Sequence, residues 1–408
     1  MKNNLYKELF DFDIDKVKKI SITKNEIYNQ LLLYIFFSSK KNLLLVVPTL
    51  NEATELYNEL KNYEDNIYLF PEDDIITKTS IAVSPELLFM RANLLNKIND
   101  DTHKIVIVHL NSFIKKLPSK NKFKSNRINL KIGNKINREE FINKLIEIGY
   151  KRESIVYNTS DFSVRGFVID IYPIEETHPI RIELFDDEIE KLKYFDEYTQ
   201  KSINEISEIS IGPIKDDFGD NNTSIKEFFD GDITIFTNYN QLLEQEKMIK
   251  PQIKYLNIEN ELFKVKDLVE DTDIFIDTIN NKNADVKIEA KSLDKYNYDK
   301  EKFIKDIKST NGILYTTNKQ LTKEINNIDK TIKIINSTLN KGFVYKNNYY
   351  FSEFDLFDSY TSKELKKDSS LGNKILSIDS INEGDYVVHR KSGIGIYRGI
   401  TTIEKNGM

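Results

Sequence analysis

The sequence has 408 residues, of which 39% are hydrophobic and 30% are charged, and its formal net charge is −6. A chain of this length is expected to form about two to four domains. The absence of Cys excludes disulfides, thiolate metal sites and a cysteine nucleophile, and the His residues are too scattered for a metal site. No apolar run approaches the roughly 18 residues that span a bilayer, and the start MKNNLYKELF lacks the apolar core of a signal peptide. We therefore expect a cytoplasmic protein with no membrane partner.

Residues 1 to about 118 alternate between predicted strands and helices. Strands are predicted at 17–22, 42–49, 66–70 and 103–110, and helices after 23, at 51–63 and at 84–98. Thr23 and Glu26 have the spacing of a capping box, which predicts that Thr23 opens the first helix. This alternation predicts a parallel sheet covered by helices.

The loop between the first strand and the first helix is ITKNE, residues 22–26, and it contains no Gly. Many parallel sheets bind nucleotide phosphates at this loop, where Gly residues let backbone N–H groups wrap the anion. The pattern GxxxxGK[ST] occurs nowhere in the chain. Lys24 is expected to be an ordinary solvent-facing lysine, so the sequence predicts a sheet of the nucleotide-binding type without its phosphate loop.

Residues near 130 to 213 read as a compact α+β module. A helix is predicted from Asn137, with Gly149 just past its end, and strands are predicted at 154–158, 162–173, 179–196 and 208–213. Asp186 and Asp187 suit a hairpin turn.

The strand that begins at residue 180 has one unusual position. Side chains on a strand alternate between its two faces. The core face is predicted to hold Ile180, Ile182 and Leu184, and the outward face Arg181, Glu183 and Phe185. An exposed Phe among charges is unfavourable unless something covers it. Either a neighbouring domain of the same chain or a protein partner is expected to do so.

Residues 102 to 138 contain no acid and ten cations. The cations are Lys104, Lys115, Lys116, Lys120, Lys122, Lys124, Arg127, Lys131, Lys135 and Arg138. Such a stretch could follow a nucleic-acid backbone. The Lys-rich composition of the whole chain favours a solvated connecting segment instead.

The remainder returns to alternating strands and helices. A weaker α/β pattern covers residues 214–288, a second covers 289–362, and a charged linker follows. Short strands with a glycine turn at Gly393 are predicted after residue 381.

Several stretches resemble the N-terminal part of Mfd, the family of bacterial transcription-repair coupling factors. FSVRGFVIDIYP and PIRIELFDDEIEKLKYFDEYTQKS resemble the damage-recognition module shared with UvrB, and GDYVVHRKSGIGIYRGI resembles the start of the domain that binds RNA polymerase. FPEDDIITKTSIAVSPELLFMRANLL and NKGFVYKNNYYFSEFDLF are looser matches. Together these stretches span nearly the full chain in the family's order.

The resemblance implies a multidomain α/β fold. Parallel α/β sheet domains lacking a phosphate loop carry an inserted α+β UvrB-like module, and a truncated SH3-like β barrel ends the chain. The implied domains are a first UvrB-like part with a degenerate nucleotide site at 1–125, the UvrA-binding module at 126–213, a second UvrB-like part at 214–288, a small α/β domain at 289–362, a linker at 363–380, and an incomplete polymerase-interacting domain at 381–408.

The resemblance also implies partners and site residues. The family's UvrA-contacting positions fall on Arg165, Arg181 and Phe185, and Gly166 is expected to mark a bulge or close backbone approach that aims Arg165. Further partners are the RNA polymerase β subunit, through a contact incomplete here, and double-stranded DNA, through an ATP-driven translocase that follows in the family. ATP and Mg²⁺ belong to that motor, so no cofactor, metal or catalytic residue is expected in these 408 residues.

Two other classes of function remain open at this point. A UvrB-type excision-repair ATPase or helicase subunit shares the middle module but keeps an intact phosphate loop. A stand-alone nucleic-acid binder would use the basic stretch at 102–138.

Ser392 stands where the family usually has His, and the chain stops at Met408, partway through the implied barrel. The chain is therefore interpreted as the UvrA-recruiting arm of a factor that releases stalled polymerase and starts nucleotide excision repair.

Overall fold

The computed structural model describes residues 5–71, 85–98, 102–215, 218–219, 221–279, 281–357, 386–389 and 393–396. The chain divides into two compact units, residues 1–367 and 368–408, and each is taken by itself. The predicted linker at 363–380 and the position of Ser392 lie outside the described residues.

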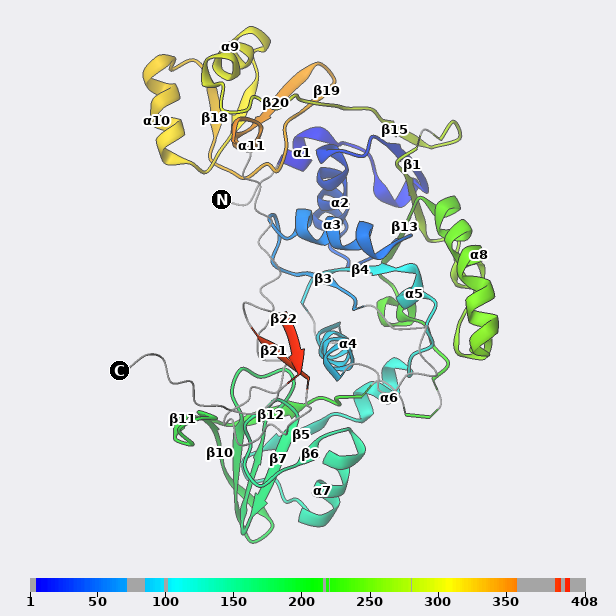
Figure 1. The fold of residues 1–408 in the computed structure, drawn as a ribbon, viewed down its shortest axis with the longest axis vertical. Helices are drawn as coiled ribbons and strands as arrows, with labels where there is room; N and C mark the ends of the chain where they lie inside the picture. The colour runs from blue at the N-terminus through cyan, green and yellow to red at the C-terminus, as the bar shows by residue number, and fades with distance from the viewer. Residues whose placement is uncertain are drawn as a thin grey trace, which may run out of the picture. The chain divides into compact units, whose positions relative to one another are not determined.

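The first sheet of the larger unit has seven strands, all parallel, which confirms the predicted α/β class (Figure 1). In spatial order the strands are β15 (Val286–Ile288), β1 (Lys19–Ile22), β14 (Ile274–Asp277), β13 (Ile233–Thr237), β2 (Leu43–Val47), β4 (Ile105–His109) and β3 (Ile67–Leu69). The sheet thus joins strands that precede the 130–213 segment with strands that follow it.

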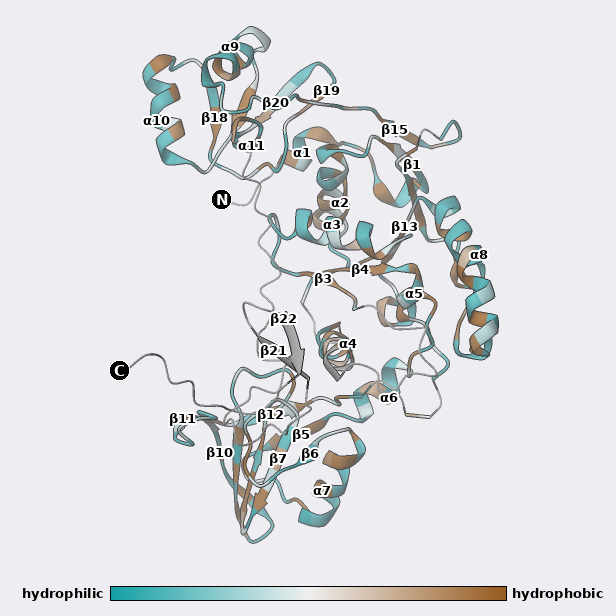
Figure 2. Ribbon diagram, in the orientation of Figure 1, coloured by the Kyte–Doolittle hydropathy of each residue, from teal (hydrophilic) through white to brown (hydrophobic). Residues whose placement is uncertain are grey.

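Helices cover both faces of this sheet, and every residue of its central strands β13, β2 and β4 is therefore buried. Alternate residues of β2 point to opposite sides: Leu43 and Leu45 join one buried cluster, and Leu44 joins the other. The first cluster includes side chains of α1 (Leu5–Leu9), α2 (Glu26–Ser39) and α3 (Leu50–Leu60), and the second those of α4 (Pro85–Ile98), α5 (Leu110–Phe113) and α8 (Tyr239–Leu256). Figure 2 shows the hydrophobic colour on the central strands of this sheet.

The start of α2 differs from the prediction. Its N-cap is Asn25, whose side chain accepts a hydrogen bond from the backbone N–H of Ile27. The Thr23 hydroxyl instead accepts from the backbone N–H of Ala290 at 3.1 Å. The prediction that Thr23 opens the helix is therefore wrong by two residues, because Thr23 makes a long-range hydrogen bond that sequence spacing does not reveal.

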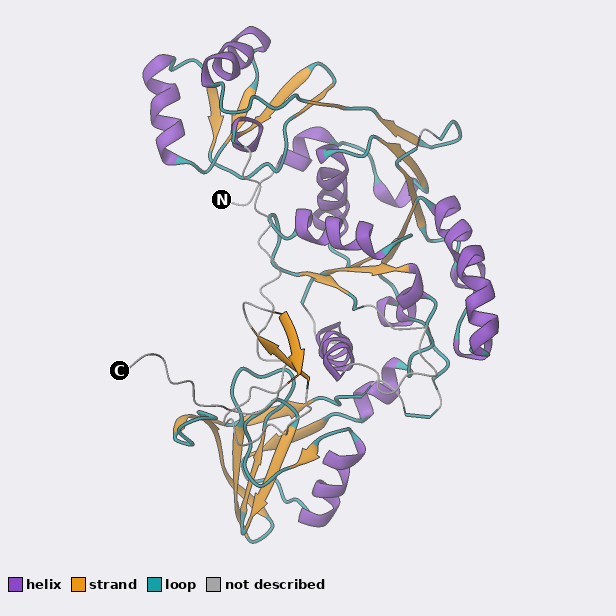
Figure 3. Cartoon of the chain, viewed as in Figure 1, coloured by secondary structure: helices purple, strands orange, loops and turns teal. Residues whose placement is uncertain are grey.

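The second sheet contains six strands and is antiparallel apart from the parallel pair of β6 and β7. Its strands are β11 (Ser202–Ile206), β10 (Glu188–Phe195), β9 (Ile180–Phe185), β8 (Val168–Ile171), β7 (Asp161–Arg165) and β6 (Lys151–Arg152). Residues 154–158, predicted as a strand, contain no strand in the structure. Helix α7 (Arg138–Glu147), capped by Asn137 as predicted, packs Phe141 and Leu145 on one face of this sheet (Figure 3).

Short elements connect this sheet to the first. They are α6 (Lys120–Ser125) and the antiparallel pair of β5 (Ile128–Lys131) and β12 (Glu208–Ile211). The guanidinium of Arg127 donates to both carboxylate oxygens of Glu175 at 2.6 and 2.7 Å and to Asn96 of α4 at 2.8 Å. The entry and exit segments of the module are thus held side by side.

A third, five-stranded sheet lies in residues 291–352. Its order is β16 (Lys291–Ser292), β19 (Phe343–Tyr345), β20 (Asn348–Ser352), β17 (Ile313–Tyr315) and β18 (Lys333–Ile335), with helices α9 (Lys300–Thr310), α10 (Lys319–Ile328) and α11 (Glu353–Leu356). The stretch NYYFSEFDLF, residues 348–357, is predicted from its sequence as one strand, but it divides between β20 and α11, because Ser352 and Asp355 form a capping box. In the smaller unit, β21 (Tyr386–His389) pairs antiparallel with β22 (Gly393–Ile396).

Within the described ranges, no helix combines the length and apolarity needed to cross a membrane.

A buried carboxyl group joins the first and third sheets. Glu26 is 2% exposed and accepts hydrogen bonds from the Tyr63 hydroxyl at 2.6 Å and the Gln30 amide at 3.0 Å. The Tyr63 hydroxyl in turn accepts from the backbone N–H of Asn340, which lies between β18 and β19. Burial raises the pKa of Glu26 to about 8. The folded protein therefore keeps this proton at pH values where the unfolded chain releases it.

This raised pKa predicts a pH dependence of stability. Between about pH 4.5 and 8 the folded state binds one proton more than the unfolded state at Glu26, so the free energy of unfolding falls as pH rises. Glu26→Gln supplies a permanently neutral side chain of the same size. We expect the variant to equal the unaltered protein near pH 5 and to exceed its stability at pH 8, as measured by urea unfolding at both values.

Glu55→Gln is the control for this experiment, because Glu55 lies exposed on α3. An unchanged difference between Glu26→Gln and the unaltered chain at pH 5 and pH 8 would contradict the assignment.

Candidate partner-binding site

The two faces of β9 differ as the alternation predicted. Ile180, Ile182 and Leu184 are buried under α7, and Arg181 and Glu183 are partly exposed on the other face. Phe185, at the end of the strand, is 76% exposed. No described segment of the chain covers it, so the first of the two predicted explanations, a neighbouring domain, finds no support among these residues.

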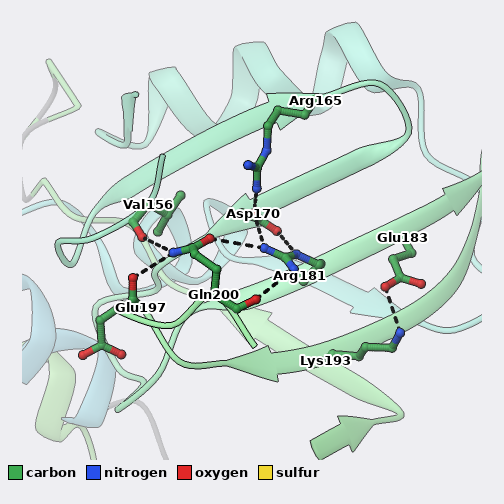
Figure 4. A network of polar contacts seen from close by, with 8 residues as sticks. All are labelled: Val156, Arg165, Asp170, Arg181, Glu183, Lys193, Glu197 and Gln200. Atoms are coloured by element: carbon green, nitrogen blue, oxygen red, sulfur yellow. Dashed lines mark hydrogen bonds and ion pairs between the residues drawn. The ribbon is translucent and has the colours of Figure 1, made fainter. Parts of the chain in front are cut away.

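The centre of the outward face is a buried carboxylate that was not predicted. Asp170 of β8 lies opposite Arg181 in the strand register, and its side chain is 1% exposed. Arg181 donates through Nε to Oδ1 at 2.7 Å and through Nη2 to Oδ2 at 2.9 Å (Figure 4). Arg165 of β7 donates through Nη2 to Oδ2 at 2.5 Å. The structure thus brings both predicted arginines to one carboxylate.

Arg181 is largely committed to contacts within the module. Its guanidinium lies 4.5 Å from the centre of the Phe195 ring, and its Nη1 and Nη2 approach the backbone and side-chain oxygens of Gln200 at 3.4 Å. The hydrogen bond to Asp170 raises the pKa of Arg181 above its usual value. Only 18% of the side chain is exposed. Arg181 therefore fixes β8, β9 and the 196–201 turn relative to one another.

Arg165 is the more accessible of the two arginines. It ends β7, its side chain is 49% exposed, and it pairs across the strands with Val168. Gly166 and Phe167 form the two-residue turn between β7 and β8, and Gly166 has φ +58°, a left-handed conformation that glycine adopts without strain. No atom approaches a Cβ built on Gly166 within 4 Å. The predicted bulge or close backbone approach is therefore wrong, because Gly166 serves a hairpin turn.

The turn after β9 is built in the same way. Asp186 and Asp187 connect β9 to β10, and Asp186 has φ +55°, which confirms the predicted hairpin. The backbone N–H of Leu184 donates to the carbonyl of Phe167 at 2.9 Å, so the two hairpin ends are adjacent. Phe167 is 61% exposed. Sequence reasoning missed this second exposed ring, although its place directly after a turn glycine was visible.

A second ion pair occupies the same face away from the hairpin ends. Lys193 of β10 donates to Glu183 at 2.8 Å and lies 4.0 Å from Glu205 of β11. These pairs balance the charge of the outer surface.

The basic stretch at 102–138 is mostly satisfied within the protein. Lys104 is completely buried, Lys120 donates to the carbonyl of Phe228, and Lys122 donates to that of Phe218. The partners of the next cations are Glu175 for Arg127, Glu208 for Lys131 and Asp187 for Lys135. Cations engaged in this way are poorly placed to follow a phosphate backbone, so the structure favours the predicted connecting segment.

The edge of the seven-stranded sheet where related folds bind nucleotides has more acidic than basic side chains. A cavity of about 220 Å³ opens where β2 and β13 end, and its charged lining residues are Glu52, Glu55, Glu59, Lys24 and Lys341. Lys24 lies 3.6 Å from Glu52, so it is an ion-pair partner. Among the described residues, no group of three or more His, Asp or Glu side chains is arranged to hold a metal ion.

This cavity leads to a prediction about ATP. The cavity lining has three carboxylates and two lysines, both lysines are paired with these carboxylates, and the loop lacks the glycines that present backbone N–H groups. We expect titration of ATP and Mg²⁺ into the protein to give no saturable heat at micromolar concentrations. Saturable binding, lost in Lys24→Ala, would contradict this and favour the motor-enzyme alternative.

The arginine contacts change the stability expected of an Arg181 variant. Because Arg181 lies on the face opposite the core, alternation alone predicts that Arg181→Ala leaves folding nearly intact. The structure shows instead that the substitution removes two hydrogen bonds from a buried carboxylate. We expect a loss of about 2–4 kcal/mol of unfolding free energy. Phe185→Ala is expected to stay within about 0.5 kcal/mol of the unaltered protein. Denaturant unfolding of both variants measures the difference, and equal stabilities would contradict it.

Comparison with known proteins agrees with the resemblance stated from the sequence. Residues 128–216 match the UvrB interaction domain, and residues 381–408 match the CarD-like/TRCF RID domain. A transcription-repair-coupling factor of Staphylococcus haemolyticus is 25% identical over an alignment that covers 90% of this chain and 41% of that protein. Factors of the same name from Staphylococcus epidermidis and Staphylococcus aureus are 36% and 37% identical over 44% of this chain and 16% of theirs.

The chain therefore spans less than half the length of the relatives it matches. The order of the two matched domains and the coverage of 90% agree with the expected position in the family. The predicted resemblance to an N-terminal portion of the transcription-repair coupling factors is thereby confirmed.

Proposed function

We propose that this protein acts in transcription-coupled DNA repair, as the part of a coupling factor that recruits UvrA. The observation that carries the proposal is the UvrB interaction domain at residues 128–216, whose outward face presents Phe185 and Arg165 to solvent. A partner that covers this face would bury an aromatic ring and desolvate a guanidinium. Such contacts supply most of the binding energy in protein interfaces.

The residues of this face take different roles in the proposal. Phe185 is the apolar anchor, since it is exposed and held at a rigid hairpin end. Arg165 offers planar N–H donors to a carboxylate of the partner. Arg181 supports Arg165 from beneath through Asp170, with a smaller part of its own side chain available for contact.

Residues 381–408 are proposed to begin a contact with the RNA polymerase β subunit. The support is the match to the CarD-like/TRCF RID domain, together with the antiparallel pair β21 and β22. An SH3-like barrel would need further strands beyond this pair. The UvrB-like character of the seven-stranded sheet is likewise proposed, and release of stalled polymerase by an ATP-driven translocase is assigned to the whole coupling factor.

The proposal predicts how substitutions on the outward face affect UvrA binding. Phe185→Ala and Arg165→Ala are each expected to cost about 2 kcal/mol or more of binding free energy, because they remove the anchor and the guanidinium. Arg165→Lys should restore little, since an ammonium cannot form two parallel hydrogen bonds to a carboxylate. Affinities are measured by calorimetry with purified UvrA.

Two controls separate binding from folding. Ile146→Ala truncates another exposed apolar side chain, 53% exposed, on α7, which covers the opposite face, and should leave the affinity unchanged. Ile182→Ala removes a fully buried side chain and should cost roughly 2–5 kcal/mol of stability. Full UvrA affinity in Phe185→Ala, or an equal loss in Ile146→Ala, would show that this face is not the binding surface.

A further inference from the structure

Asp170 occupies a position that the proposed contacts do not explain. Its carboxylate lies in the middle of the binding face, yet its side chain is 1% exposed and both oxygens accept hydrogen bonds from arginines (Figure 4). A carboxylate enclosed in this way does not itself reach a partner. Any effect it has on binding must pass through the guanidinium groups that enclose it.

The two guanidinium groups are bound unequally. Arg181 contacts both oxygens of Asp170, lies over the Phe195 ring and is 18% exposed. Arg165 contacts one oxygen through one nitrogen and is 49% exposed. The other N–H donors of Arg165 are used by no described residue. Arg165 is thus anchored at one end of its guanidinium and open at the other.

This inequality decides which arginine is available to a partner. If Arg165 turned away, Asp170 would keep two charge-assisted hydrogen bonds from Arg181, so no buried charge would be left unpaired. If Arg181 turned away, Asp170 would keep one. A partner therefore engages Arg165 at much lower cost than Arg181.

Anchoring by Asp170 also restricts the conformations of Arg165. A long side chain at a strand end samples many rotamers in solvent, and binding has to select one of them. The bond of 2.5 Å between Nη2 and Oδ2 fixes the direction of the guanidinium before a partner arrives. The backbone of Phe185 is also held in place, since Phe185 ends β9 directly before a two-residue turn.

We propose that Asp170 is a positioning residue that orients Arg165 for a carboxylate of the partner protein. The partner's surface would then pair an acidic side chain with an apolar hollow, matching the guanidinium of Arg165 and the ring of Phe185. The inference rests on the proposed binding of UvrA, and it adds a residue that acts through Arg165 without touching the partner.

A double-mutant cycle tests the inference with the full chain and purified UvrA. Asp170→Asn removes the charge at nearly constant size. Where Arg165 is present, the substitution is expected to weaken UvrA binding about tenfold, the usual effect of a lost charge-assisted hydrogen bond. In the Arg165→Ala background the same substitution should change the affinity less than about twofold, because the side chain through which Asp170 acts is gone.

Asp170→Glu covers the case in which Asp170→Asn is poorly folded. It keeps the charge but displaces the carboxylate by one methylene, so it should also weaken binding where Arg165 is present and have little effect where it is absent. Glu175→Gln is the control, since the largely buried Glu175 also receives two hydrogen bonds from one arginine, Arg127, in the same module. Its effect on UvrA affinity should be small and independent of Arg165. Thermal melting of every variant confirms that the binding measurements concern folded protein.

Each outcome distinguishes the inference from its alternatives. Equal losses from Asp170→Asn with and without Arg165 would assign Asp170 a structural role and overturn the inference. Tighter binding by Asp170→Asn would also overturn it, because Asp170 would then compete with the partner for Arg165. Absence of UvrA binding by the unaltered chain would overturn the proposed function itself, and the inference with it.

Discussion

The buried charge of Asp170 constrains the whole outward face of the six-stranded sheet. A carboxylate with 1% exposure is stable only if its oxygens are paired, and here three hydrogen bonds from two arginines pair them. Those bonds tie β7, β8 and β9 together by their side chains as well as by their backbones. Arg181, which makes two of these bonds, is 18% exposed, whereas Arg165, which makes one, is 49% exposed. Arg181 therefore supports the face, and Arg165 is accessible to a partner.

Hairpin geometry places the accessible groups together. The turns after β7 and β9 each contain two residues, and each uses a left-handed first residue, Gly166 and Asp186. Short turns of this kind leave little freedom at the strand ends. Because both hairpins point the same way in an antiparallel sheet, the exposed residues Phe167 and Phe185 lie at the same end of the sheet as Arg165. An apolar edge next to a guanidinium suits a protein partner better than it suits a nucleic acid, whose phosphates would find the neighbouring lysines already paired.

Much of this arrangement follows from the sequence, and the exceptions have physical causes. The parallel α/β sheet and the opposite faces of β9 follow from local periodicity, because backbone geometry alone sets which side chains share a face. The bonds between Asp170 and the two arginines join three strands, so they depend on the register of two strand pairs, which the periodicity of a single strand does not give. Thr23 shows the same limit. Its spacing to Glu26 suggested a cap, but its hydroxyl bonds a residue more than 260 positions away.

The first and second sheets place their buried carboxyl groups in opposite electrostatic settings, and this separates their functions. Glu26 is surrounded by neutral donors, and burial raises its pKa to about 8, so it holds a proton and joins α2 to the 340 segment as an uncharged group. Asp170 is surrounded by guanidinium groups, and it orients charge at a surface. A carboxyl group that carries a proton near neutral pH can stabilise packing between sheets, but it offers nothing to a charged ligand. The carboxylate of Asp170 instead holds a partly exposed guanidinium, that of Arg165, at the surface. We therefore expect recognition at the second sheet, with the first sheet as its support.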